Sequence, residues 1–241
     1  MMCKNNTLPV SLIIPTHNRE MKICRLLHSL EKLSAKPYEI IIINDGSNDG
    51  TEEKVSEWLD SEKSLSKKLI NIPHSKGPAN ARNKGILFAS QTLVAFTDDD
   101  VVVTPHWLKR LVEKIIHSDP SIAGVGGRVL PLNKDILSQY YSEIRLLDPP
   151  KNLQYIVTAN ACFKKDIISK VGLFDNSFTF AGGEDTELCF RLRKMKYRFL
   201  FQREAVVYHD YSSNFLDFCK TWIRYGKGTG RAINAIKRGP E

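Results

Sequence analysis

Apolar runs alternate with amphipathic stretches along the first hundred residues. Four mostly apolar runs have the length of a strand: residues 8–14, 38–43, 68–72 and 93–97. Three stretches between them have the apolar spacing of a helix face: residues 21–32, 51–61 and 79–90. Near-continuous apolar strands separated by helices are typical of a parallel sheet covered on both faces. The pattern therefore predicts a doubly wound, nucleotide-binding-type α/β half over about residues 8–104.

The second half of the chain is patterned less regularly. Pro105 suits the first turn of a helix that should run to about His117. Further along, we expect strands at 122–130 and 155–163, a helix at 184–195, short strands at 198–201 and 205–208, and a helix at 215–225. Gly226, Gly228 and Gly230 should then loosen the chain. Residues 1–212 are expected to form one domain, with residues 105–212 as its acceptor and catalytic half and 213–241 as a basic, helical extension.

Composition fits one globular domain. The chain has 241 residues, of which 42% are hydrophobic and 26% charged, enough for a sizeable core. No apolar stretch approaches the ~18 residues of a spanning helix, and the N-terminus lacks the apolar region of a signal peptide. The five cysteines are widely spaced without a Cys-x-x-Cys pair, as in proteins with reduced thiols. We therefore expect a cytoplasmic protein.

The net charge of +8 is concentrated near the C-terminus. Residues 186–241 contain 12 Lys+Arg and 5 Asp+Glu, a net charge of +7. Such a surface is either simply solvated or attracts a phosphorylated ligand, an anionic membrane or nucleic acid. Because no nucleic-acid-binding motif accompanies the charge, nucleic acid is not an expected partner. We do expect a peripheral contact with an anionic membrane, at its inner face.

Three adjacent carboxylates, Asp98, Asp99 and Asp100, follow the apolar run 93–97. Ligands of open α/β sheets gather at the carboxyl ends of strands, and hard oxygen ligands suit Mg²⁺ or Mn²⁺. A solvated acidic turn is the alternative. A second acidic pair, Glu184-Asp185, favours a metal-assisted active site. Since neither common phosphate-loop motif is present, a cation that bridges a diphosphate to carboxylates is the expected substitute.

Six short motifs carry the most specific signal. They are Ile14-Pro15-Thr16-His17-Asn18-Arg19, Asn44-Asp45-Gly46-Ser47, Ala81-Arg82-Asn83-Lys84-Gly85, Phe96-Thr97-Asp98-Asp99-Asp100, Gly183-Glu184-Asp185-Thr186-Glu187-Leu188 and Val207-Tyr208-His209. Together and in this order, they resemble the family-2 glycosyltransferases. The resemblance implies the GT-A fold, a mostly parallel, twisted sheet flanked by helices. It also implies a nucleotide-sugar donor, Mn²⁺ or Mg²⁺, and inversion at the anomeric carbon.

The resemblance assigns donor-binding roles. Asp45 would contact the base and Asp98 the ribose. The loop with Pro15, Thr16, Asn18 and Arg19 would line the base pocket. Arg82 would approach the diphosphate, unless it is simply a solvated helix residue. A UDP-sugar is expected first, with dTDP- and GDP-sugars as alternatives.

The resemblance also implies a metal site. Asp100 would be the metal ligand of the Asp-x-Asp motif, with Asp99 as its neighbour on the donor side. His209 would complete the site, unless it is only a strand-end histidine. Trp222, Arg224 and Tyr225 fall where relatives often have an aromatic and basic element over the donor.

Asp185 resembles the general base. An inverting transfer needs one carboxylate to take the proton of the acceptor hydroxyl, and a helix N-terminus stabilises that carboxylate. Helix capping alone is the alternative. Glu184 and Gly183 are expected near the acceptor, where Gly182 and Gly183 would let a substrate approach closely. Trp107 either lines the acceptor groove or packs in the core.

We therefore expect a metal-dependent, inverting enzyme that moves one sugar from a nucleoside-diphosphate sugar to a hydroxyl of a glycan or lipid-linked acceptor, as in polysaccharide biosynthesis. A non-catalytic nucleotide- or glycan-binding module is one alternative. A sugar-nucleotide nucleotidyltransferase is another, although it would need a glycine-rich phosphate loop where residues 15–19 stand. The absence of a Gln-x-x-Arg-Trp motif argues against a polymer-extruding synthase.

Overall fold

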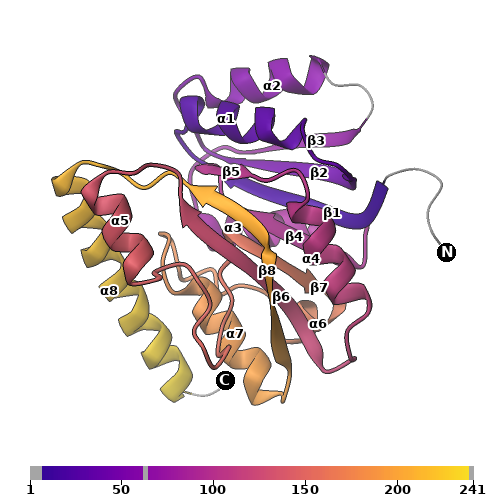
Figure 1. The fold of residues 1–241 in the computed structure, drawn as a ribbon, viewed down its shortest axis with the longest axis vertical. Coiled ribbons are helices and arrows are strands. Elements are labelled where there is room, and N and C mark those ends of the chain that lie inside the picture. The colour runs from indigo at the N-terminus through magenta and orange to yellow at the C-terminus, as the bar shows by residue number, and fades with distance from the viewer. Residues whose placement is uncertain (1–6, 62–64, 239–241) are drawn as a thin grey trace.

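A computed structural model describes residues 7–61 and 65–238, and the side chains up to residue 234. The strands are β1 (Thr7–Thr16), β2 (Lys36–Asp45), β3 (Ser66–Ile72), β4 (Leu93–Thr97), β5 (Val101–Val103), β6 (Ile122–Pro131), β7 (Asn160–Lys164) and β8 (Arg198–His209). The helices are α1 (Glu20–Leu30), α2 (Thr51–Ser61), α3 (Pro78–Phe88), α4 (Trp107–Ile116), α5 (Ile136–Glu143), α6 (Lys165–Lys170), α7 (Glu184–Lys194) and α8 (Phe215–Arg238). The described strands form one sheet of order β3-β2-β1-β4-β7-β6-β8-β5 (Figure 1).

The predicted doubly wound half is confirmed. Strands β1 to β4 pair in parallel, with β1 between β2 and β4. The four isoleucines of residues 40–43 are fully buried, and their side chains alternate between the two faces. Ile40 and Ile42 join the core that α1, α2 and α4 cover. Ile41 and Ile43 join the core beneath α3, α6 and α7.

The second half makes the sheet mixed. Strand β7 is antiparallel to both β4 and β6, whereas β6 and β8 are parallel. The run predicted as a strand at 155–163 forms strand only from Asn160. The two strands predicted at 198–201 and 205–208 are one strand, β8, whose register against β6 shifts between Gly127 and Arg128. The alternation of apolar residues is interrupted at this irregularity, but the strand continues through it.

The last helix continues further than the sequence predicts. The expected loosening after Tyr225 is wrong, because α8 runs through Gly226, Gly228 and Gly230 to Arg238. At Gly228, the helix backbone lies against Gly182, where a Cβ would overlap the Gly182 carbonyl oxygen. Tertiary contact therefore holds a segment of low helix propensity in a helix. Helix α8 also lies beside α5 (Figure 1), where Tyr140 packs edge-on against Phe218.

Helix α8 is long enough to be considered for a membrane span, but its composition is too polar. Within the described ranges, no helix has both the length and the apolarity needed to cross a bilayer.

Candidate active site

Two carboxylates and an imidazole converge at one edge of the sheet. Asp98 and Asp100 follow β4, and His209 ends β8. Strand β5 begins directly after the acidic triplet and pairs with β8. One ligand atom from each of the three residues lies within 4.8 Å of the others. His209 Nε2 is 3.3 Å from Asp100 Oδ1, and its buried Nδ1 has no hydrogen-bond partner among the described residues. Two hard carboxylates and one borderline imidazole nitrogen fit a divalent cation such as Mn²⁺, and the carboxylates also suit Mg²⁺.

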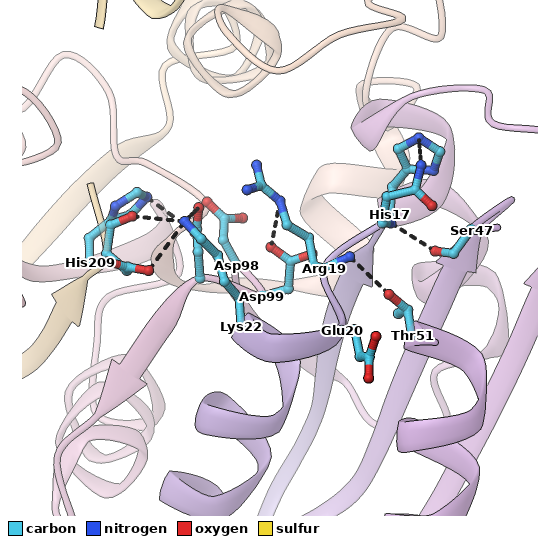
Figure 2. Close-up of polar contacts among 12 residues, drawn as sticks. His17, Arg19, Glu20, Lys22, Ser47, Thr51, Asp98, Asp99 and His209 are labelled. Atoms are coloured by element: carbon cyan, nitrogen blue, oxygen red, sulfur yellow. Dashed lines mark hydrogen bonds and ion pairs between the residues drawn. The ribbon is translucent and has the colours of Figure 1, made fainter. Parts of the chain in front are cut away.

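Basic side chains from the start of α1 surround this cluster, as Figure 2 shows. Lys22 Nζ is 3.7 Å from Asp100 Oδ2 and 3.3 Å from Asp210 Oδ2. Arg19 Nε is 4.0 Å from Asp99 Oδ1. Burial and the adjacent Asp100 charge raise the pKa of Asp99 to about 7, and Arg19 opposes that shift. Sequence analysis did not identify Lys22, because its partners are distant in sequence and no local pattern joins them.

The expected donor residues line one cavity of about 420 Å³. Its walls include most of the side chains assigned to the donor: Pro15, Thr16, Arg19, Asp45, Arg82, Asp98 and Asp99. The two residues assigned to the metal, Asp100 and His209, also line it. Arg224 and Tyr225 of α8 close the cavity from the other side. Asn18 is the exception and does not line it. Its backbone has a φ of 51°, and its side-chain oxygen accepts a hydrogen bond from Asn48 N at 2.8 Å. The structure therefore gives Asn18 a role in joining two loops.

Asp45 binds a loop as well as lining the cavity. Its Oδ2 accepts hydrogen bonds of 2.8 Å from Ser75 Oγ and from Gly77 N, and its Oδ1 accepts one of 2.9 Å from Lys76 N. Gly46 has a φ of 68°, and a Cβ there would lie 2.5 Å from Ser75 N. Asp45 thus fixes one wall of the cavity, and its contact with a base stays a prediction.

Arg82 connects the donor cavity to the acidic pair at the start of α7. It is 3% exposed. Its Nη2 is 2.8 Å from Asp98 Oδ1, and its Nη1 is 2.8 Å from Glu184 Oε1. The solvated-arginine alternative is therefore wrong. The guanidinium also lines the donor cavity, where its buried Nε has no partner among the described residues.

Asp185 lies one residue further along α7. Its Oδ1 accepts a hydrogen bond of 2.7 Å from Thr186 N, and its Oδ2 accepts a long one of 3.4 Å from Thr158 N. Burial, followed by the Glu184 charge, raises the pKa of Asp185 to about 7, while Arg82 lowers it. A carboxylate with one lightly used oxygen and this pKa suits general-base chemistry near neutral pH.

Of the three residues expected near the acceptor, Glu184 and Gly183 line a cavity together with Asp185, and Trp107 does not. Glu184 is 3% exposed, and its oxygens accept hydrogen bonds from Arg82 Nη1 and, at 2.7 Å, from Gly182 N. At Gly183 a Cβ would lie 2.5 Å from the Gly228 carbonyl oxygen, so α8 rather than a substrate requires the glycine. Trp107 is fully buried and donates a hydrogen bond of 2.7 Å to Asn160 Oδ1. It belongs to the core, and the groove alternative is wrong.

A second cavity, of about 580 Å³, lies beside the donor cavity. It contains Asp185 and is covered by α8, with Trp222 among its walls. The two cavities share Arg82, Asp98, Ala181, His209 and Tyr225. A phosphorylated compound in the first cavity and a hydroxyl compound in the second would therefore meet at the Asp98–His209 edge, with a base on the hydroxyl side.

A mostly parallel α/β sheet with a carboxylate cluster at the carboxyl ends of its strands is a nucleotide-binding type of fold. The model of glycosyl transferase family 2 matches residues 11–172, so the chain belongs to this family. Among curated relatives, the pre-mycofactocin glycosyltransferase of Mycobacterium tuberculosis is 30% identical over 245 residues, which cover 96% of this chain and 48% of the relative. The glycosyltransferase AglE of Haloferax volcanii is 27% identical, over 92% of this chain and 74% of the relative. The chain spans about half the length of the first of these relatives.

Solved structures confirm the predicted fold class. The mannosyltransferase PcManGT of Pyrobaculum calidifontis, solved with GDP-Man and Mn²⁺, superposes with a TM-score of 0.77 at 19% identity, over 98% of this chain and 67% of that one. GalNAc-T7, solved with UDP, GalNAc and Mn²⁺, gives a TM-score of 0.71 at 20% identity, over 94% and 48%. At these identities the likeness concerns the GT-A fold alone.

Proposed function

We propose that this chain is a glycosyltransferase that moves one sugar, with inversion, from a nucleoside-diphosphate sugar to an acceptor hydroxyl. The observation that carries the proposal is the meeting of two cavities at Asp98 and His209, one with Asp45 and Asp100 and the other with Asp185. The names of the relatives support sugar transfer, and the GDP-Man and UDP complexes of fold neighbours support a nucleotide-sugar donor. The Asp45 carboxylate can accept the imide N–H of uracil or of thymine. We take UDP-sugars first, with dTDP- and GDP-sugars as the alternatives.

Asp98, Asp100 and His209 would hold Mn²⁺ or Mg²⁺. When bound, the cation supplies positive charge that stabilises the departing diphosphate. Arg224 of α8 also lines the donor cavity, and its buried Nε has no partner among the described residues. It would add a charge-assisted hydrogen bond to the same phosphates.

Asp185 would act as the base. As the acceptor oxygen forms its bond to the anomeric carbon, the carboxylate takes the hydroxyl proton, and the bond from that carbon to the diphosphate oxygen breaks. Attack from the side opposite the leaving group inverts the configuration. Arg82 holds Glu184 and, through it, the first turn of α7, so the base keeps its position when the donor site fills.

A thermal-shift screen with UDP, dTDP and GDP, each with and without Mn²⁺, tests the donor and metal together. A ligand raises the free energy of unfolding by RT ln(1 + [L]/Kd), about 2.7 kcal/mol at a hundredfold excess over Kd. We expect one diphosphate to stabilise the chain, to do so only with Mn²⁺, and to lose that effect in Asp100→Asn. Equal stabilisation in EDTA would contradict the metal site.

Release of the diphosphate from the matching sugar donor then tests catalysis, and proton NMR of the product gives the anomeric configuration. Binding without turnover of any donor and acceptor would favour the non-catalytic module instead. Formation of pyrophosphate from a nucleoside triphosphate and a sugar phosphate would favour the nucleotidyltransferase.

The acceptor proposed here is a glycan or lipid-linked compound, and with it a peripheral contact with an anionic membrane. Five exposed apolar residues lie on α5, directly after it and at the start of α8, and we name them the outer patch: Ile136, Tyr140, Ile144, Phe215 and Leu216. Exposed lysines occur on the same segments of the chain, among them Lys134 and Lys220. Apolar side chains next to basic ones are typical of surfaces that bind anionic lipids.

A further inference from the structure

The cavity that contains Asp185 has an apolar interior. It runs from the first turn of α7 to the inner face of α8 and has a volume of about 580 Å³. Its larger side chains come from three separate segments: Leu146, Leu147, Tyr155, Val157, Trp222 and Ile233. Because three segments contribute, the apolar lining is a property of the assembled site and not of one amphipathic helix.

The charged side chains of this cavity are largely engaged with one another, because Arg82 bridges Asp98 and Glu184. Glu184 is held by Arg82 and Gly182, and Thr186 Oγ1 is 3.4 Å from Asp185 Oδ1. Thr158 and Thr229 add two hydroxyl groups. A buried sugar ring needs a partner for most of its hydroxyl groups, since each group left without one costs about 1–3 kcal/mol. Leu146, Leu147, Val157 and Ile233 offer no such partner, so the part of the cavity that they line suits a group with few hydroxyls.

The aromatic residues indicate what kind of group this is. Tyr155 faces Asp185, whose charge contributes to the raised pKa of the Tyr155 phenol after burial. The ring of Trp222 is held by Tyr141, which stacks on it at 6.4 Å between centroids. Trp222 Nε1 is buried without a hydrogen-bond partner among the described residues. Fixed aromatic walls favour a flat apolar group.

We propose that the acceptor carries an apolar, ring-sized group beside its reacting hydroxyl, and that this group fills the cavity between Asp185 and α8. The inference rests on the proposed function, because Asp185 defines the hydroxyl end of the cavity. An aromatic or branched aliphatic group and the first part of a lipid chain share this chemistry. The test separates these two sources.

Glucosides that differ only in the aglycone provide the probe. With the donor found in the Mn²⁺ screen, kcat/KM is measured for phenyl, octyl and methyl β-D-glucopyranoside. We expect the phenyl compound to exceed the methyl compound by about tenfold or more, the effect of burying much of one ring. An advantage for octyl over phenyl would identify a lipid chain as the source. Equal values for all three would overturn the inference.

Two isoleucines of α8 give a matched pair of variants. Ile233 lines the cavity and is 46% exposed, whereas Ile223 is 60% exposed and lines neither cavity. Ile233→Asn should reduce the advantage of the preferred aglycone over the methyl glucoside several-fold, and Ile223→Asn should leave that advantage unchanged. If both variants act alike, the inference is wrong.

Saturation-transfer NMR of the same glucosides with the full chain distinguishes an error in this inference from an error in the proposed function. It reports contact with the aglycone without any donor or turnover. Contact that Ile233→Asn removes, in a chain that transfers no sugar, would support the apolar cavity and contradict the glycosyltransferase. Sugar transfer without an aglycone preference would contradict only the inference made here.

Discussion

At the scale of single residues, Asp185 should determine the pH dependence of the reaction. Burial and Glu184 raise its pKa to about 7, and only the deprotonated form can accept a proton. The value of kcat/KM should therefore rise with pH through about 7 and level off above it. Asp185→Asn should lower kcat by about 10²–10⁴ and leave the donor Kd nearly unchanged, because the base contacts the acceptor. Near-normal turnover in this variant would leave Asp185 as a helix cap.

Arg82 should be the most costly side chain of the site to remove. Its loss leaves Asp98 and Glu184 without their cation, and breaking a buried pair in this way costs about 3–5 kcal/mol. Arg82→Met should therefore lower the free energy of unfolding, measured in urea, by at least about 3 kcal/mol. Adding Glu184→Gln should restore part of that loss by removing the buried charge left behind.

The matched control for Arg82 is an exposed ion pair. Lys109 Nζ is 3.7 Å from Glu113 Oε1, and both side chains are about half exposed. Lys109→Met should change stability by at most about 1 kcal/mol. If Arg82→Met costs no more than this control, the bridge does not stabilise the fold.

Sequence alone could predict part of this site. Asp45, Asp98 and Asp100 follow apolar strands, and the carboxyl ends of parallel strands share one edge of a sheet, so their meeting was predictable. The pairs Arg82–Glu184 and Lys22–Asp100 join residues far apart in the chain. These contacts depend on how α3, α7 and α1 pack, which no local pattern records.

At the scale of elements, α8 illustrates how glycine can mislead. Three glycines within five residues argue against a helix by propensity, yet two of the three have open space around them and one has none. No atom lies within 4 Å of a Cβ built at Gly226 or Gly230, whereas at Gly228 the Gly182 carbonyl leaves no room for one. Only Gly228 is thus required by packing, and it sets α8 against the loop before Asp185.

This difference predicts opposite effects for one substitution. Gly230→Ala should raise the free energy of unfolding by up to about 1 kcal/mol, since alanine favours the helix. Gly228→Ala should lower it by about 1–3 kcal/mol, because the added methyl overpacks the contact with Gly182. Urea unfolding of both variants measures this, and a stabilised Gly228→Ala would mean that α8 does not pack closely there.

At the scale of the whole molecule, predictability falls from the first half to the second. In the first half each apolar run is one parallel strand, and a helix joins each strand to the next within the order β3-β2-β1-β4. In the second half β7 enters antiparallel between β4 and β6, and short elements such as β5 and α5 appear. Those elements are short and depend on contacts with distant segments, so the period of the apolar residues along the chain does not reveal them.

The charge of the whole chain leads to the last prediction, which concerns membranes. A net charge of +8 and the outer patch should together bring the protein to anionic vesicles. In a flotation assay, binding to phosphatidylglycerol vesicles should exceed binding to phosphatidylcholine vesicles. It should also fall steeply between 0.15 M and 1 M salt, as the Debye length shortens from about 8 to about 3 Å.

Phe215→Asn with Leu216→Asn should reduce the partition about tenfold or more by removing apolar area. Met21→Asn, at an apolar position of α1 that is 76% exposed and outside the patch, should not. Equal binding to both kinds of vesicle, or no effect of salt, would leave the basic residues as ordinary solvated surface.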